Sequence, residues 1–195
     1  VDGTGIIVAV ADSGLDSGTN DSTMHPDFRD HIVDIVSLPM TPWWASTCGS
    51  PANDGAEDID GHGTHVAGSV LGDGTDSSGN IKGMAPEARL YFQSVGSYCA
   101  NNPPGERNTL LGIPTNKTDL FRFAAENGSR VHTNSWGNTC SPSAPCYSEY
   151  TMGSLQADIA AREYTNMTIL FSAGNSGADA NLNGEVDFDS LGNPA

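Results

Sequence analysis

The sequence predicts an α/β domain in which a mostly parallel sheet has helices on both of its faces. Three observations predict this class. Short apolar runs rich in β-branched residues recur along the chain, segments with helical spacing separate them, and no internal repeat or long low-complexity linker interrupts their order. The 195 residues are enough for one domain with a sizeable core, so residues 1–195 are expected to fold together.

The elements follow from these patterns in chain order. Apolar runs predict buried strands at 5–11, 88–95, 130–136 and 167–173. Helical spacing predicts helices at 64–72, 118–128 and 148–166. In the second of these helices, Thr118 is a candidate N-cap and Gly128 a candidate C-terminal stop. The stretches 37–60 and 96–117 are rich in Pro, Gly, Asn and Ser, and they predict long surface loops.

The chain is strongly acidic, with a net charge of −16 and a pI of about 4.2. Nucleic acids and anionic membranes need a basic surface, so neither is expected as a partner. No apolar run reaches the roughly eighteen residues that a membrane span requires. The first ten residues do not resemble a signal peptide, although a mature secreted chain would have lost one.

Several features favour an extracellular location. The chain has few lysines, an even number of cysteines, and four Asn-x-Ser/Thr triplets as candidate glycosylation sites. These triplets begin at Asn20, Asn116, Asn127 and Asn166. The first two lie in loop-like sequence and are the best candidates to carry glycans.

The four cysteines include no Cys-x-x-Cys pair, which argues against a zinc ribbon or a thioredoxin-like site. Cys140 and Cys146 bracket a short loop that is well suited to closure by a disulfide. That pairing leaves Cys48 with Cys99, one from each long loop. Free buried thiols are the alternative, and they are less common in secreted proteins.

Polar and glycine-rich sequence follows three of the predicted strands directly. Asp12 ends the first strand, Ser135-Trp136-Gly137 follows the third, and Gly174-Asn175 follows the last. In open α/β sheets, ligands bind beyond the carboxyl ends of the strands. These positions are therefore where a functional site is expected.

His62 lies in the stretch "DGHGTHVAGSVLG" (60–72), at the start of a predicted helix. The helix dipole disfavours a protonated imidazole there, but a neighbouring carboxylate would restore basicity and leave one ring nitrogen as a general base. Gly61 and Gly63 would leave space for a substrate backbone. The structural alternative is a half-buried histidine with satisfied hydrogen bonds, and His65, within the helix, is interpreted in that way.

Asn175 lies in "FSAGNSG", where glycines leave its amide without bulky neighbours. Such a side chain can donate a hydrogen bond to a developing oxyanion. The alternative is an asparagine in a tight turn.

Together these segments resemble the subtilisin-like serine proteases over residues 2–195. "VAVADSGLD" resembles the aspartate motif of that family, and "GHGTHVAGSVLG" matches its histidine motif almost letter for letter. "KGMAPEARLYFQSV" resembles the segment and strand that follow. "HTNSWGN" resembles a wall of the primary specificity pocket, and "FSAGNSG" the oxyanion segment.

The resemblance implies a secreted endopeptidase that hydrolyses extended peptide or protein substrates. Asp12 would orient His62, His62 would act as general base and then acid, and Asn175 would donate to the oxyanion. The primary specificity pocket would be lined by Ser135, Trp136, Gly137, Ser172, Ala173 and Gly174. The segment near Leu111 and Gly112 would pair with substrate as an edge strand.

One part of the family pattern is missing. The nucleophile of the family lies in a Gly-Thr-Ser-Met-Ala-like turn, and residues 1–195 contain neither this turn nor a G-x-S-x-G elbow. One explanation is that these residues are the N-terminal part of a peptidase catalytic domain, whose remainder lies on the same or a separate chain. The other is a nucleophile-less secreted glycoprotein that uses the fold as a scaffold. The first is favoured, because an incomplete sheet would leave an unpaired edge and an exposed core.

The segment "DANLNGEVDFDS" (179–190) has the oxygen spacing of a calcium loop. The expected ligands are Asp179, Asn181, Asn183, Glu185 (through its main-chain carbonyl) and Asp187. Gly184 has the sixth position, where such loops turn sharply, while Ser190 replaces the usual bidentate glutamate at the twelfth. A structural Ca²⁺ is therefore expected, and a solvated acidic turn is the alternative.

Overall fold

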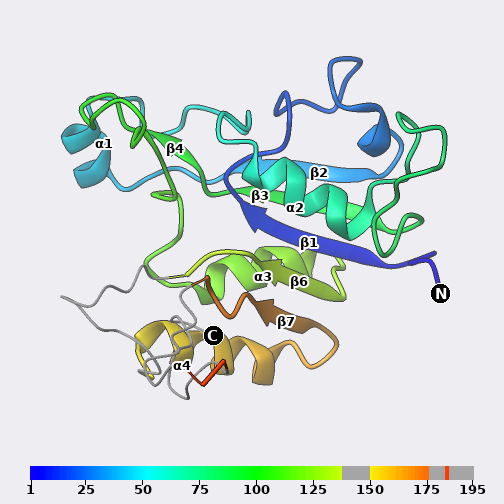
Figure 1. Ribbon diagram of the computed structural model, residues 1–195. Helices are drawn as coiled ribbons and strands as arrows, with labels where there is room; N and C mark the ends of the chain where they lie inside the picture. Colours follow the sequence, from blue (N-terminus) through cyan, green and yellow to red (C-terminus); the bar gives the residue numbers. More distant parts are fainter. Residues whose placement is uncertain (138–149, 176–182, 185–195) are drawn as a thin grey trace.

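A five-stranded parallel sheet forms the centre of the computed structural model, which describes residues 1–137, 150–175 and 183–184 (Figure 1). The strands lie in the order β2-β3-β1-β6-β7, and each neighbouring pair is parallel. Their bounds are β1 (Ile7–Asp12), β2 (Ile32–Ser37), β3 (Arg89–Ser94), β6 (Val131–Asn134) and β7 (Thr168–Phe171). The carboxyl ends of all five strands therefore meet at one edge of the sheet.

Helices cover both faces of this sheet, as the sequence predicts. Side chains alternate along β1, so Val8 and Val10 face one layer while Ala9 and Ala11 face the other. The first layer contains α2 (His62–Leu71), and the second contains α3 (Thr118–Glu126) and α4 (Met152–Glu163). Gly128 follows α3 with a φ of +81°, in agreement with a C-terminal stop, but the N-cap position belongs to Lys117 and not to Thr118.

The first predicted loop, 37–60, contains a short helix, α1 (Pro42–Cys48), and so is not entirely a loop. Thr41 caps this helix with its side chain, proline occupies the first turn, and Gly49 ends it in the left-handed conformation. Strand β2 and a short 3₁₀ helix, η1 (Pro26–Phe28), were also not expected. A half-exposed edge strand lacks the continuous apolar run that identifies buried parallel strands.

The second predicted loop, 96–117, contains a two-stranded antiparallel hairpin made of β4 (Ser97–Tyr98) and β5 (Asn108–Thr109). A disulfide between Cys48 and Cys99 joins α1 to the residue that follows β4, which confirms the expected pairing. Cys140 and Cys146 lie outside the described residues. The disulfide packs against Met40 and Leu111, so the two long connections form one small apolar cluster of their own.

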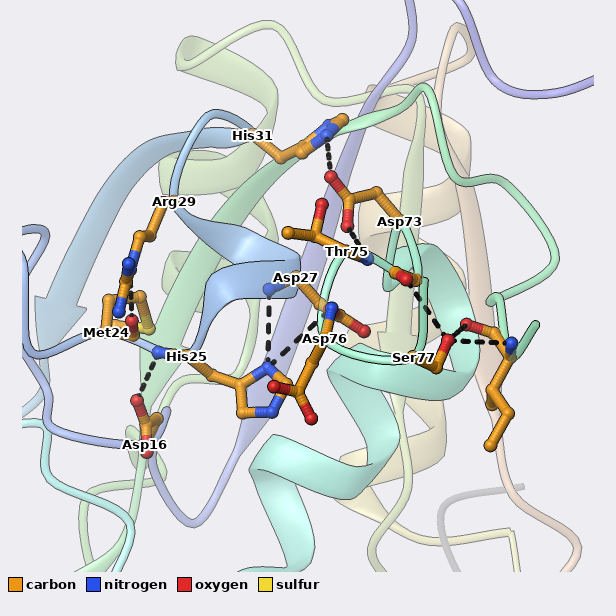
Figure 2. Close-up of polar contacts among 12 residues, drawn as sticks. Asp16, Met24, His25, Asp27, Arg29, His31, Asp73, Thr75, Asp76 and Ser77 are labelled. Atoms are coloured by element: carbon orange, nitrogen blue, oxygen red, sulfur yellow. Dashed lines mark hydrogen bonds and ion pairs between the residues drawn. The ribbon is translucent and has the colours of Figure 1, made fainter. Parts of the chain in front are cut away.

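Carboxylates tie the segment that follows α2 to η1 and to His31, the residue just before β2, as Figure 2 shows in part. Asp73 accepts a hydrogen bond from Thr75 N and lies 3.5 Å from His31 Nε2. Asp27 Oδ1 accepts from Asp76 N at 2.7 Å. These contacts hold the segment after α2 beside η1 and the start of β2.

No helix in the described part of the chain is long and apolar enough to cross a membrane.

His132 lies on β6, between β1 and β7, and is fully buried. Its Nε2 lies 2.9 Å from Gln93 Oε1, and its Nδ1 lies 3.1 Å from Asn134 Nδ2. This geometry suits a neutral ring that donates from Nε2 and accepts at Nδ1. Burial lowers the pKa of His132 to about 3.

We expect His132 to make the protein sensitive to acid. An unfolded histidine binds a proton near pH 6.5, whereas folded His132 does so only near pH 3. Its contribution to stability is therefore complete above pH 6.5 and is lost progressively as the pH falls towards 3. Between pH 7.5 and pH 5 this linkage should remove about 2 kcal/mol from the free energy of unfolding, measured by urea denaturation.

The His132→Gln variant is the control, since an amide can donate to Gln93 without titrating. It should show a correspondingly weaker loss of stability over the same pH range, whatever its stability at neutral pH. An identical pH dependence in both proteins would contradict the assignment.

Candidate active site

A buried carboxylate and a half-exposed imidazole meet at the carboxyl edge of the sheet. Asp12 is the last residue of β1 and is 1% exposed, and His62 is the first residue of α2, with 48% of its side chain exposed. His62 Nδ1 lies 2.7 Å from Asp12 Oδ1. The second ring nitrogen, Nε2, has no hydrogen-bond partner among the described residues, so it is the nitrogen available for proton transfer.

The two glycines beside His62 have different structural roles. Gly61 has a φ of +84° and lies in the left-handed conformation that starts the helix, with open space around it. A Cβ on Gly63 would lie 2.3 Å from Gly14 O and 3.1 Å from Asp12 Cβ. Gly63 therefore serves the close approach of α2 to the turn after β1, and not the space for a substrate that the sequence suggested.

Asp58 connects that turn to the start of α2. Its Oδ1 accepts hydrogen bonds from Ser13 Oγ at 2.8 Å and Gly61 N at 2.9 Å. Its Oδ2 accepts from Thr64 N at 2.8 Å and from Thr64 Oγ1 at 2.5 Å. Ser13 Oγ in turn accepts from Gly63 N at 2.9 Å. A carboxylate beside a helix N-terminus satisfies orphan N–H groups and complements the dipole.

The sequence analysis missed Asp58 and Ser13. The signal that could have found Asp58 is an acidic residue just ahead of a glycine-started helix, which is a typical capping arrangement. Ser13 had no comparable signal, because its role depends on the approach of a segment about fifty residues later in the chain.

The carboxylates around His62 favour its charged form. The hydrogen bond to Asp12 raises the pKa of His62, burial opposes this, and the negative charges of Asp12, Asp60 and Asp58 add to the increase. Burial raises the pKa of Asp12, while hydrogen bonds from His62 and Ser13 N lower it. Asp12 Oδ2 is buried with no hydrogen-bond partner in the described part of the chain, which accounts for the dominance of burial at this carboxyl.

A cleft of about 580 Å³ opens beside this pair. The β4–β5 hairpin supplies one wall through Ser97, Tyr98, Asn108 and Thr109, and Leu110 continues it. Ser135, which follows β6, completes the lining near His62. The unexpected hairpin therefore supplies much of the candidate substrate cleft.

Several predicted site residues do not line this cleft. Trp136 is buried, donates from its indole N–H to Ala11 O at 3.0 Å, and packs edge-on against Phe171. Leu111 packs with the disulfide cluster, and Gly112 N donates to Val95 O at 3.0 Å. Residues 108–110, just before the predicted segment near Leu111 and Gly112, line the cleft instead.

The predicted oxyanion segment follows β7 at the same edge of the sheet as Asp12. Ser172 N donates to Asn134 O at 3.0 Å and extends the pairing of β6 with β7. Ala173, Gly174 and Asn175 are exposed, as is Gly137 after β6. None of these exposed residues is among those that line the cleft.

A second concave region, a groove of about 570 Å³, lies between α2 and the face of the sheet. Its lining is mostly apolar and includes Val66 and Val70 of α2 and Leu170 of β7. His62 and Ser135 line both this groove and the cleft. His65 also lines the groove and is exposed, so its interpretation as a half-buried histidine was wrong.

The expected calcium loop falls mostly outside the described residues, including Asp179, Asn181, Glu185 and Asp187. Asn183 and Gly184 are described, and Gly184 has a φ of +86°, which suits a sharp turn. The four asparagines of the predicted glycosylation triplets are exposed: Asn20, Asn116, Asn127 and Asn166.

Comparisons with known proteins agree on one family. The model of the subtilase family matches residues 3–195. The serine protease/ABC transporter B family protein tagD of Dictyostelium discoideum is 31% identical over 141 residues, which are 70% of this chain and 7% of that protein. The major intracellular serine protease of Bacillus subtilis is 37% identical over 95 residues, which are 49% of this chain and 25% of that protein.

The solved structures agree with this family. The S41 psychrophilic protease has a TM-score of 0.55 and 26% identity, and the match covers 91% of this chain and 48% of that one. The chain thus spans about half of this solved protease and less than a tenth of tagD.

The pKa of His62 should depend on Asp12. In the Asp12→Asn variant the pKa of His62, followed by NMR of the imidazole ring, should fall, because the amide removes the charge and the charged hydrogen bond. In the unsubstituted protein it should lie above the ordinary 6.5. A His62 pKa at or below 6.5 before substitution, or one unchanged in Asp12→Asn, would contradict the coupling.

Asp58 should stabilise the site through its hydrogen bonds rather than its charge alone. Asp58→Ala leaves four donors without their acceptor and should lower the free energy of unfolding by about 2–4 kcal/mol. Asp60→Asn, which removes a nearby charge from an exposed side chain, should change it by less than about 0.5 kcal/mol. Equal losses of stability in urea unfolding would show that charge, and not the network, is responsible.

Proposed function

The chain belongs to the subtilase family, and from this premise we propose that it supplies the aspartate and histidine of an Asp–His–Ser triad to a serine endopeptidase. The observation that carries the proposal is the 2.7 Å contact between His62 Nδ1 and buried Asp12 at the mouth of a 580 Å³ cleft. A carboxylate that fixes one ring nitrogen leaves the other as the base, which is the arrangement that activates a hydroxyl nucleophile.

The proposed reaction is acyl transfer. His62 Nε2 takes the proton of a serine hydroxyl while its Oγ attacks the scissile carbonyl, and Asp12 stabilises the imidazolium that forms. The imidazolium then gives its proton to the leaving amine, so the peptide bond breaks and a serine ester remains. Water, deprotonated by His62, hydrolyses that ester and restores the serine. Asn175 would donate a hydrogen bond to the oxyanion in both steps.

The nucleophile is proposed to come from a segment beyond residues 1–195. The family's Gly-Thr-Ser-Met-Ala turn is missing from this sequence, and the chain spans 48% of the S41 protease that it matches. The mostly apolar groove between α2 and the sheet is a suitable place for that segment to pack, since Leu170 is 48% exposed, Met84 is 87% exposed, and both line it. His62 lines this groove as well as the cleft, so a serine arriving there would approach the free ring nitrogen.

Extracellular location, glycans and a structural Ca²⁺ at 179–190 remain part of the proposal. The exposure of the asparagines in the four triplets is compatible with modification.

The competing function is a secreted glycoprotein scaffold without a nucleophile. The Asp12–His62 geometry favours the enzyme, because a scaffold has no need for a buried carboxylate aligned on a half-exposed imidazole.

Labelling with a fluorophosphonate, which reacts with activated serines, tests the proposal in the protein isolated from its native source. We expect one labelled serine, located by mass spectrometry outside residues 1–195, and loss of labelling in His62→Ala, because the serine is then no longer deprotonated. Residues 1–195 alone should show no peptide hydrolysis above that of His62→Ala.

Two results would overturn the proposal in different ways. A labelled serine within residues 1–195 would contradict the origin of the nucleophile. Complete lack of labelling and of peptide hydrolysis in the native protein would favour the scaffold.

A further inference from the structure

Carboxylates stand along one side of the cleft beside His62. Asp54, Glu57 and Asp60 line it, and all three are exposed. They belong to the segment that leads from α1 to α2. Among the described residues no lysine or arginine lines the cleft or forms an ion pair with any of the three.

These three carboxylates differ in whether they already have a hydrogen-bond partner within the protein. Asp54 Oδ2 already accepts a hydrogen bond from Tyr98 N at 2.5 Å. Arg107 donates to the hydroxyl of Tyr98 at 3.1 Å, so one positive charge lies near that end of the cleft. Glu57 and Asp60 have no side-chain partner in the described part of the chain. The negative charge without a partner among the cleft carboxylates is therefore that of Glu57 and Asp60.

The negative charge of Asp60 acts on the imidazole of His62, because it contributes to the raised pKa of that residue. Buried Asp12, whose Oδ2 has no hydrogen-bond partner among the described residues, lines the same cleft. A cleft lined by charges of one sign concentrates its field on whatever binds there. The ligand that suits this cleft is therefore cationic where it passes Glu57 and Asp60.

The cleft also has apolar surface beside the charges. Ile59 lies between Glu57 and Asp60 in the sequence, is exposed, and lines the cleft, and Leu110 lines it from the hairpin side. Lysine and arginine have aliphatic stems that pack on apolar side chains while the charged end stays in water. A small metal cation would not use this apolar surface, so a basic side chain of a peptide fits the combination better.

We propose that Glu57 and Asp60 select substrates with a lysine or arginine close to the scissile bond. This inference rests on the proposed peptidase function and names its substrate class. The selection acts through charge pairing at the rim of the cleft, so it should weaken as ionic strength rises.

The test uses the native protein and a series of quenched fluorescent peptides that are identical except at one position. That position carries lysine, norleucine (which has a similar stem without the charge) or glutamate, and it is moved along both sides of the scissile bond. At one or two positions near the bond, we expect kcat/KM for lysine to exceed that for norleucine by about fivefold or more, with glutamate poorest.

Variants then identify the carboxylates responsible. Glu57→Gln and Asp60→Asn should each lower the lysine-to-norleucine ratio, and the double variant should bring it close to one. Asp30→Asn and Glu87→Gln make the same chemical changes at exposed positions outside the cleft lining, and they should leave the ratio unchanged. Fluorophosphonate labelling of each variant checks that the site is intact.

The outcomes separate the two proposals. Cleavage of all peptides with no preference for lysine, or with a preference that survives the double variant, would overturn the inference and leave the peptidase function standing. An equal loss of preference in the control variants would assign it to overall net charge and would also overturn the inference. A protein that is not labelled and cleaves none of the peptides would instead contradict the proposed function.

Discussion

The close approach of the turn after β1 to the start of α2 is the constraint on which the site depends. It requires a residue without a side chain at Gly63, because a Cβ there would overlap Gly14 O at 2.3 Å. Asp58 then holds the two segments together through Ser13 and the first turn of the helix. Only with this approach does the Asp12–His62 hydrogen bond reach 2.7 Å, so the chemistry of the imidazole follows from backbone packing.

The arrangement of strands explains why the functional residues converge. All five strands of the main sheet are parallel, so β1, β6 and β7 end at one edge and bring Asp12, Ser135 and residues 172–175 to that edge. Helix α2 packs against one face of the same sheet, and its N-terminus, with His62, lies at that edge. His62 therefore lines both the cleft beside the hairpin and the mostly apolar groove between α2 and the sheet.

The carboxylates near His62 have different environments and therefore different roles. Asp12 is buried and holds the imidazole of His62 by a hydrogen bond. Asp58 accepts hydrogen bonds from backbone and hydroxyl donors, whereas Glu57 and Asp60 line the cleft. A net charge of −16 does not distinguish these roles. Burial and hydrogen-bond partners do, because they determine whether a carboxylate's charge is already compensated or remains available to a ligand.

The sequence by itself determined the fold class, four of the five strands of the main sheet, three of the helices, and the pairing of Asp12 with His62. The last of those strands, β7, was expected to be buried but is partly exposed, because it lies at the edge of the sheet. Periodicity and short motifs carry that information locally. The tertiary structure alone decided the parts that depend on distant contacts. It showed β2 and the β4–β5 hairpin as elements, Trp136 as a buried residue bonded to Ala11, and Ser13 as a partner of the helix start. Edge strands, short hairpins and cross-chain hydrogen bonds are stabilised by neighbours far away in the sequence, and local patterns do not record those neighbours.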